Sequence, residues 1–183
     1  MTGLVGYQAR VDWIGTEVLT LADVWPENPR AVIVGLNPAK TSVDAGHYYQ
    51  GRAGQGQMRR LADAGLFPAA SSRYFEEAAL AAGVGFTDIV KRPSVGEGDV
   101  RREEIRYGSA VLAANLAARD VPLVVCVFRH PVKVLLGSEG SPGVQAKATS
   151  WGARVFRMPG PYDKRENVVR VMNELRHILG NSR

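Results

Sequence analysis

The chain has 183 residues, of which 45% are hydrophobic and 22% charged, and its formal net charge is +5. This length and apolar content suit one compact domain, and no stretch approaches the ~20 apolar residues of a membrane-spanning helix. The first ten residues lack the charged-then-apolar order of a signal peptide, so we expect a cytoplasmic protein, and we expect it to be a monomer. The excess positive charge favours a polyanionic partner without identifying one.

Cysteine and histidine are too few and too scattered for the common metal sites. Cys126 is the only cysteine and lies in an apolar run, which excludes an internal disulfide and indicates core packing. His47, His130 and His177 are far apart in the sequence and show no spacing typical of metal ligands. We therefore expect a site without a metal ion or another cofactor.

The first 35 residues are predicted to form an N-terminal arm and then the first core strand. The arm has one short strand near residues 17–20, and the core strand at residues 31–35 contains three β-branched residues in succession, which suits burial on both faces. Leu36-Asn37-Pro38 follows, where proline ends the strand and disfavours the helical conformation for Asn37. Open α/β sheets bind ligands at this end of their strands, although the same residues are also typical of an ordinary turn.

Strands and helices alternate along the rest of the chain. Short apolar runs predict further strands at residues 84–90, 123–128 and 151–158, and helical spacing predicts helices at 55–64, 73–82, 101–119, a short one from 131, and 167–179. Residues 46–51, 94–99 and 137–150 are predicted to be loops. This alternation predicts a three-layer α/β/α sandwich with a central, mainly parallel sheet of four to five strands. We expect one domain over residues 1–183, with an arm at 1–30 and a core at 31–180.

Three segments together resemble a known family. They are Gly35-Leu36-Asn37-Pro38-Ala39, Gly46-His47-Tyr48-Tyr49, and Gly85-Phe86-Thr87-Asp88-Ile89-Val90-Lys91-Arg92-Pro93-Ser94. Their order and spacing are similar to those of the mismatch-specific uracil/thymine-DNA glycosylase branch of the uracil-DNA glycosylase superfamily, over about residues 30–179. The resemblance implies a monofunctional enzyme of base excision repair that hydrolyses the N-glycosidic bond of uracil or a related damaged base in DNA.

The resemblance also implies roles for single residues. Asn37 is expected to orient the attacking water, because an amide is too weak a base to take its proton. Tyr49 matches the aromatic residue that stacks on a flipped base, and Tyr48 is the competing candidate. Backbone groups at Leu36 and Tyr49, with Gly35 beside them, are expected to read the edge of the base.

Asp88 stands where relatives often have asparagine or lysine. A carboxylate there can accept the N3–H of uracil, or it can act as the general base for the water, and both roles stay open. An ionised Asp88 near the departing base would oppose the negative charge that grows on it. A solvent-exposed aspartate at a strand end, with no part in the reaction, is the structural alternative.

The loop before the last helix departs from the family pattern. It reads Met158-Pro159-Gly160-Pro161-Tyr162-Asp163-Lys164-Arg165 and lacks the asparagine or histidine of the family motif. Pro161 stiffens this loop, Gly160 permits close approach to DNA, and Tyr162 is expected to stack in the place that the flipped base leaves. Phosphate contacts are expected from basic residues at strand ends and in loops: Arg52, Lys91, Arg92, Lys164 and Arg165.

Two other classes of function are compatible with these residues. A non-catalytic DNA-binding relative would keep the basic surface and the tyrosine pocket without turnover. A small-molecule nucleosidase would keep Asn37 but would not need basic residues that face a duplex. The residues do not choose among uracil, thymine, hypoxanthine and alkylated bases, nor do they specify the opposite base or the strandedness of the substrate.

Overall fold

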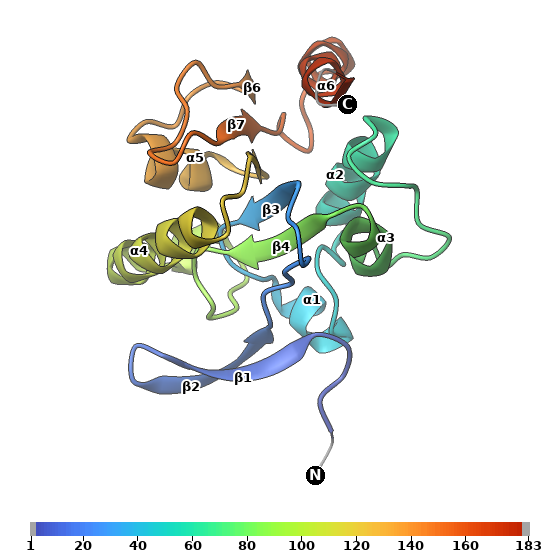
Figure 1. The fold of residues 1–183 in the computed structure, drawn as a ribbon. Coiled ribbons are helices and arrows are strands. Elements are labelled where there is room, and N and C mark those ends of the chain that lie inside the picture. Colours follow the sequence, from blue (N-terminus) through green and yellow to red (C-terminus); the bar gives the residue numbers. More distant parts are fainter. Residues whose placement is uncertain (1–2, 181–183) are drawn as a thin grey trace.

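The computed structural model describes residues 3–180 and contains two β-sheets in that range (Figure 1). β1 (Gln8–Trp13) and β2 (Thr16–Leu21) form an antiparallel hairpin. The second sheet has the strand order β4-β3-β5-β7-β6, built from β3 (Ala31–Gly35), β4 (Val84–Asp88), β5 (Leu123–Cys126), β6 (Gly143–Val144) and β7 (Arg154–Arg157). Four of these strands run parallel, and β6 pairs antiparallel with β7.

Helices cover both faces of the larger sheet. They are α1 (Lys40–Ala45), α2 (Arg52–Asp63), α3 (Glu76–Ala81), α4 (Arg102–Ala118), α5 (Arg129–Leu136) and α6 (Arg165–Gly180), with a short 3-10 turn η1 (Glu97–Asp99) before α4. Buried residues of α2, α3 and α6 belong to one core cluster, and those of α4 and α5 belong to the other. The predicted three-layer α/β/α sandwich with a mainly parallel sheet is therefore confirmed. No helix within residues 3–180 has the length and apolar character needed to cross a membrane.

β3 lies at the centre of the molecule because both of its faces are covered. Ala31 and Ile33 contribute to the core under α2, α3 and α6, whereas Val32 and Val34 contribute to the core under α4 and α5. All four residues have no exposed surface. Full burial of a valine or isoleucine side chain contributes roughly 1.5–3 kcal/mol, so the carboxyl end of β3 is a firmly anchored part of the molecule.

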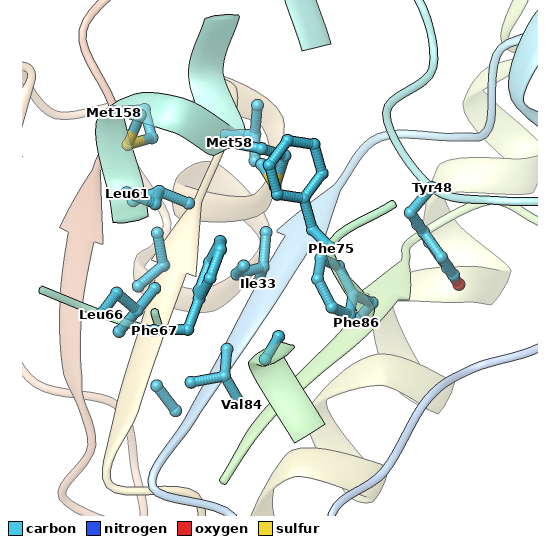
Figure 2. Close-up of a cluster of buried hydrophobic side chains, with 14 of the residues drawn as sticks. Ile33, Tyr48, Met58, Leu61, Leu66, Phe67, Phe75, Val84, Phe86 and Met158 are labelled. Carbon is cyan, nitrogen blue, oxygen red and sulfur yellow. The ribbon is translucent and has the colours of Figure 1, made fainter. Parts of the chain in front are cut away.

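Figure 2 shows the first of these two cores. Ile33 of β3 and Phe86 of β4 pack with Met58 and Leu61 of α2, and all four side chains are fully buried. α2 is amphipathic, so its apolar stripe faces this core while its other residues remain available for polar contacts. This packing holds α2 firmly against the sheet.

The sheet changes its winding direction between β3 and β5. The helices that follow β3 pack on one face, and α5, which follows β5, packs on the other. The loops that leave these two neighbouring strands diverge, and such a divergence opens a crevice at the carboxyl ends of the strands. Asn37 follows β3 and Phe128 follows β5, so both stand at this crevice.

Several short elements differ from the prediction. The arm holds a two-stranded hairpin, and α1 and β6 were not predicted, because elements of two to six residues are too short to show a clear apolar period. The strand predicted at 151–158 begins only at Arg154, since Gly152 has a left-handed φ of 89° that interrupts an extended chain. α2 begins at Arg52, three residues earlier than predicted, directly after the extended Gly51.

Candidate active site

The side-chain amide of Asn37 is held in one orientation. Its Nδ2 donates to the carbonyl oxygen of Arg92 at 3.0 Å and to Oγ of Ser94 at 2.8 Å, and the Ser94 hydroxyl donates onward to the carbonyl of Gly96 at 2.8 Å. Both amide hydrogens are therefore used within the protein. Oδ1 of Asn37 is left as an acceptor, which is the group that can orient a water molecule.

A pocket of about 260 Å³ opens beside Asn37. Its walls come from the loops that follow three adjacent parallel strands, and they consist of Leu36, Asn37, Ala39, Ser94, Val95, Gly96, Glu97 and Phe128. Phe128 is 41% exposed although it is a large apolar residue. The pocket lies in the crevice between the ends of β3 and β5, which is where this topology places a ligand.

Gly35, Asp88 and Tyr49 meet at the end of β3. Gly35 pairs in register with Asp88, and a Cβ atom on Gly35 would lie 2.2 Å from Oδ1 of Asp88 and 3.0 Å from the Tyr49 hydroxyl. Only glycine leaves room for both polar groups. Within the described residues, the buried Tyr49 hydroxyl has no hydrogen-bond partner. An unpaired buried hydroxyl is costly, so its presence points to a ligand that would satisfy it.

The carboxyl of Asp88 is only 6% exposed. Desolvation by burial raises the pKa of Asp88 from 3.8 to about 7, against the attraction of Lys91, and the nearby Asp23 raises it further. Near neutral pH this carboxyl is therefore divided between its neutral and ionised forms. In the neutral form it offers one donor and one acceptor, whereas in the ionised form it only accepts.

Backbone N–H groups complete this part of the site. The carbonyls of Gly35 and Leu36 accept from the N–H groups of Ile89 and Val90, at 3.1 and 2.8 Å. Among the residues that the structure describes, no group accepts from the N–H of Leu36 or of Tyr49. The main-chain N–H groups of Leu36, which follows Gly35, and of Tyr49, whose hydroxyl lies beside Gly35, are therefore available as donors.

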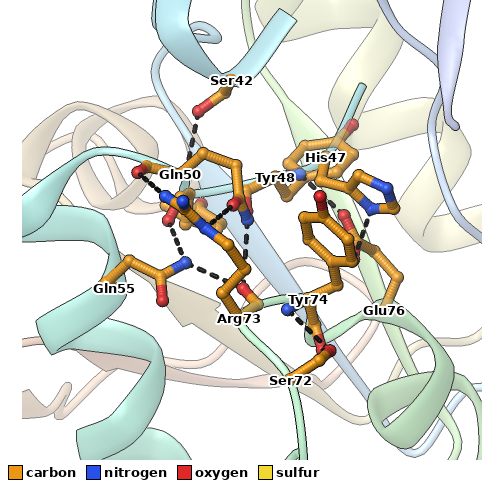
Figure 3. Close-up of polar contacts among 10 residues, drawn as sticks. Ser42, His47, Tyr48, Gln50, Gln55, Ser72, Arg73, Tyr74 and Glu76 are labelled. Carbon is orange, nitrogen blue, oxygen red and sulfur yellow. Dashed lines mark hydrogen bonds and ion pairs between the residues drawn. The ribbon is translucent and has the colours of Figure 1, made fainter. Parts of the chain in front are cut away.

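Tyr49 adopts a left-handed backbone conformation, with φ of 55°, which is unfavourable for a residue with a bulky side chain. A polar network holds it there (Figure 3). Nε2 of Gln55 donates to the Tyr49 carbonyl at 3.0 Å and to the Arg73 carbonyl at 2.9 Å. Arg73 donates in turn to the side chain of Gln50 at 2.9 Å, and Gly54 packs directly against the Tyr49 backbone.

A buried carboxylate supports the start of the same loop. Oε1 of Glu76 accepts from the Tyr48 N–H at 2.7 Å, and its Oε2 lies 3.2 Å from Nδ1 of His47. Tyr74 stacks on His47 with 3.6 Å between ring centroids (Figure 3). These supports were not predicted, because single polar residues scattered over residues 50–76 form no recognisable motif.

Tyr48 lies in the core, which corrects the expectation that it competes with Tyr49 for the base. Tyr48 is 3% exposed, it stacks on Phe86 at 5.2 Å between ring centroids, and its hydroxyl donates to the carbonyl of Ala22 at 3.0 Å (Figure 2). The two tyrosine rings lie 6.0 Å apart between centroids, but it is the Tyr49 hydroxyl that lies beside Gly35.

Two of the predicted phosphate-binding cations form ion pairs inside the protein. Lys91 pairs with Asp23 at 2.5 Å, and Arg92 donates twice to the buried Glu104, at 2.7 Å for each bond. The expectation that both cations are free for DNA is corrected, because these carboxylates need partners where water is largely excluded. Arg52, Lys164 and Arg165 are exposed and have no ion-pair partner within residues 3–180.

The loop between β7 and α6 is fixed by side chains of α2. Nε2 of Gln57 donates to the Pro159 carbonyl at 2.8 Å, and Arg60 donates to the carbonyls of Gly160 and Pro161 at 2.9 and 3.2 Å. Tyr162, which follows, is 84% exposed. These contacts were not predicted, since Gln57 and Arg60 are about 100 residues away from the loop in the sequence.

Cysteine and histidine were considered above as possible metal ligands. Cys126 is buried in β5, where burial raises the pKa of its thiol. In the described part of the chain, no group of three or more histidine, cysteine, aspartate or glutamate residues is arranged to hold a metal ion.

The structure thus combines an α/β sandwich with a fixed asparagine, a buried carboxyl and a tyrosine at the carboxyl edge of its sheet. Comparison with known proteins shows the family to which this combination belongs. The model of the uracil DNA glycosylase superfamily matches residues 22–174. The chain belongs to this superfamily. It is also 36% identical, over 87 residues, to a G/U mismatch-specific uracil DNA glycosylase of Schizosaccharomyces pombe, a match that covers 47% of this chain and 27% of the relative.

Proposed function

We propose that this protein is a monofunctional DNA glycosylase that hydrolyses the N-glycosidic bond of uracil, or of a related damaged base, in base excision repair. The orientation of the Asn37 amide carries the proposal. Its two N–H groups are bound to Arg92 and Ser94, so its oxygen is the acceptor available for a water beside the pocket. Membership of the uracil DNA glycosylase superfamily supports this reading of the geometry.

The reaction would proceed through a sugar with oxocarbenium character. The bond between the base and C1′ of the deoxyribose breaks, and the electron pair leaves with the base. The water oriented by Oδ1 of Asn37 adds to C1′ and gives an abasic site. Its proton passes to the departing base or to solvent, since a carboxamide does not accept it. Asn37 would therefore act by orientation, with no change in its own protonation.

The group at Gly35 would bind the flipped base. Tyr49 supplies the aromatic face for stacking, and the unpaired N–H groups of Leu36 and Tyr49 can donate to the carbonyl oxygens of a pyrimidine. We assign to Asp88 the neutral form, in which its hydroxyl donates to a base carbonyl and its carbonyl accepts N3–H. A neutral carboxyl at this place does not oppose the charge on the departing base.

Exposed groups would contact the DNA. Arg52, Lys164 and Arg165 are the basic residues that remain available for phosphates, and Tyr162 is the exposed aromatic that would fill the vacated place in the duplex. Stacking by a tyrosine is tolerant of base identity, so we expect weak discrimination between guanine and adenine opposite uracil, and some cleavage of single strands.

We further propose that residues 1–183 act as a single unit, as a monomer and in the cytoplasm. Residues 1–30 would form its arm and residues 31–180 its core. The indole N–H of Trp13 in the hairpin donates to Glu104 of α4 at 3.1 Å in a buried contact, which supports one unit. The absence of a membrane-spanning helix from the described residues is compatible with this proposal.

A panel of labelled oligonucleotides, each with one lesion, tests the proposal when cleavage at abasic sites by alkali is measured. We expect strand breaks at uracil after incubation with the protein. DNA binding without breaks on any lesion would instead favour a non-catalytic DNA-binding relative. Equal rates on free deoxyuridine and on DNA would favour a nucleosidase.

A further inference from the structure

Gln57 and Arg60 form one polar unit on the surface of α2. They are separated by one helical turn, so their side chains lie on the same face. Nη1 of Arg60 donates to Oε1 of Gln57 at 2.8 Å, which leaves the Gln57 amide nitrogen directed at the Pro159 carbonyl. Gln57 is 2% exposed, and its bond to the loop is buried. The pair is therefore an internal support, with the Arg60 charge turned toward carbonyl oxygens of the protein.

Within the supported loop, one main-chain hydrogen bond, from the N–H of Asp163 to the carbonyl of Gly160 at 3.2 Å, closes a turn over residues 160–163, but this bond does not tie the turn to the rest of the molecule. Pro159 and Pro161 have no N–H group, and the N–H of Gly160 donates to Oδ2 of Asp163 at 2.8 Å. All three carbonyls from Pro159 to Pro161 accept from α2 side chains. A Cβ atom on Gly160 would lie 2.8 Å from Oδ1 of Asp163, so a larger residue would require this side chain to shift. The side chains of α2 thus tie this turn, with Tyr162 in it, to the body of the molecule.

The same helix also holds the other aromatic of the candidate site. Gln55 of α2 donates to the Tyr49 carbonyl, and Gly54 packs against the Tyr49 backbone. α2 is anchored in the core by Met58 and Leu61, which have no exposed surface. One rigid helix therefore determines the positions of both the stacking tyrosine and the exposed Tyr162.

We infer that Gln57 and Arg60 are positioning residues that preset the loop at Pro159–Pro161, so that Tyr162 enters a DNA duplex in a fixed orientation. The inference rests on the proposed glycosylase function. It also explains how the protein would act on paired DNA, since an ordered loop would present Tyr162 to the duplex. A loop that is already ordered loses little conformational entropy when it contacts DNA. A single-stranded substrate has no vacated place to fill, so its cleavage does not need this order.

Two substitutions test the inference, with a control from the same helix. Gln57→Leu removes the donor to Pro159 with little change in volume, and Arg60→Lys keeps the charge but cannot bond both carbonyls and Gln57 in the same way. Arg59→Ala removes a charge from an adjacent, exposed residue that makes no hydrogen bond to the loop. The measurement is single-turnover release of uracil from matched duplex and single-stranded oligonucleotides.

We expect Gln57→Leu and Arg60→Lys to slow release from duplex by about tenfold and from single strands by less than about twofold, while Arg59→Ala keeps the wild-type ratio. Combining either substitution with Tyr162→Ala is expected to slow release from duplex little more than Tyr162→Ala alone, because both changes remove the insertion of Tyr162 into the duplex. Equal losses on the two substrates, or fully additive losses on duplex, would overturn the inference.

Hydrogen–deuterium exchange of residues 157–165 in the protein without DNA provides a readout that does not depend on activity. Gln57→Leu and Arg60→Lys are expected to speed exchange in this segment relative to Arg59→Ala, with unchanged exchange in the strands. Unchanged exchange in the loop would overturn the inference. If wild type released no uracil from either substrate, the proposed function would fail, and the exchange result would still decide whether α2 orders the loop.

Discussion

The carboxyl of Asp88 is buried, and burial disfavours its ionised form. The raised pKa means that folding favours the protonated form, so the contribution of this group to stability is greatest below pH 3.8 and declines as pH rises toward about 7. Asp23 increases the penalty and Lys91 reduces it. A residue that costs stability at the working pH is expected at a functional position, since active sites commonly combine strain with chemistry.

The pH dependence of the reaction tests the state in which Asp88 acts. With the neutral form as the active one, we expect kcat/KM for uracil release to be nearly constant below about pH 6 and to fall about tenfold for each unit well above pH 7. The Asp88→Asn variant, which does not titrate, should show a flat profile over the same range. A rate that instead rises through pH 7 would identify an ionised Asp88 acting as general base on the water.

The sequence predicted the residues that follow strands in short motifs and missed those that support them. Gly35 and Asn37 were found because glycine and proline mark the end of their strand, whereas Asp88 was found through the family resemblance of its segment. Ser94 was quoted in a motif, but its bond to Asn37 spans 57 residues and leaves no local signal. Tyr48 and Tyr49 were not separable, since the left-handed φ at Tyr49 decides which of them faces the site.

At the level of elements, Glu104, a buried acidic residue of α4, joins this helix to the hairpin and to the loop after β4. Glu104 accepts from Arg92 and from Trp13 of β1, and the backbone N–H of Arg101 donates to it at 3.0 Å. The pKa of Glu104 is lowered to about 2, mainly by the hydrogen bonds from Arg92 and also by those from Arg101 and Trp13, against the opposing effect of burial. This contact also fixes Arg92, whose carbonyl holds Asn37.

Breaking this pair is expected to destabilise the fold. Arg92→Ala leaves the Glu104 carboxylate buried without its main partner. We therefore expect the free energy of unfolding at pH 7, measured by urea denaturation, to fall by about 3–5 kcal/mol. Arg106 is an exposed arginine on α4, the helix that carries Glu104. Its replacement, Arg106→Ala, should change the free energy of unfolding by less than about 0.5 kcal/mol.

The pH dependence of stability provides the second part of that test. A lowered pKa means that the stabilisation by Glu104 is present above pH 4.5 and is lost as pH falls toward 2. The stability difference between wild type and Glu104→Gln should therefore shrink across this interval. A difference that stays constant from pH 5 to pH 2 would show that the ion pair is not its source.

Helices and strands with a clear apolar pattern were predicted from the sequence, whereas the shortest helix and strands were not. The strand β3 has the predicted bounds, and the helices α4 and α6, which carry long apolar patterns, have ends that differ from the prediction by one or two residues. α1 has six residues, of which Ser42 and Val43 are buried, so it offers no repeat to detect. The hairpin alternates poorly because both of its faces are partly exposed.

For the whole molecule, the sequence predicted the layer architecture and the excess of positive charge, whereas the distribution of free charge required the structure. Lys91 and Arg92 could not be separated from Arg52, Lys164 and Arg165 by sequence, because ion pairs with Asp23 and Glu104 depend on distant segments. The basic surface available for DNA is therefore smaller than the sequence predicts.

The salt dependence of DNA binding measures this surface. We expect the logarithm of the association constant to fall linearly with the logarithm of salt concentration, and Arg52→Ala or Lys164→Ala to reduce the slope by about one unit each. Arg176→Ala should leave the slope unchanged, because eleven residues of helix separate it from Arg165 by about 16 Å. A slope near zero for the wild type would argue against phosphate contacts altogether.

The central claim is that Asn37, held by Arg92 and Ser94, orients the water that releases uracil from DNA. Single-turnover cleavage of a uracil-containing oligonucleotide by wild type and by Asn37→Ala, with binding measured in parallel, tests it most directly. We predict release by the wild type, and a loss of at least about tenfold in the variant, equivalent to 1.4 kcal/mol of barrier, with nearly unchanged DNA affinity. An equal rate in the variant, or no uracil release by the wild type, would contradict the claim.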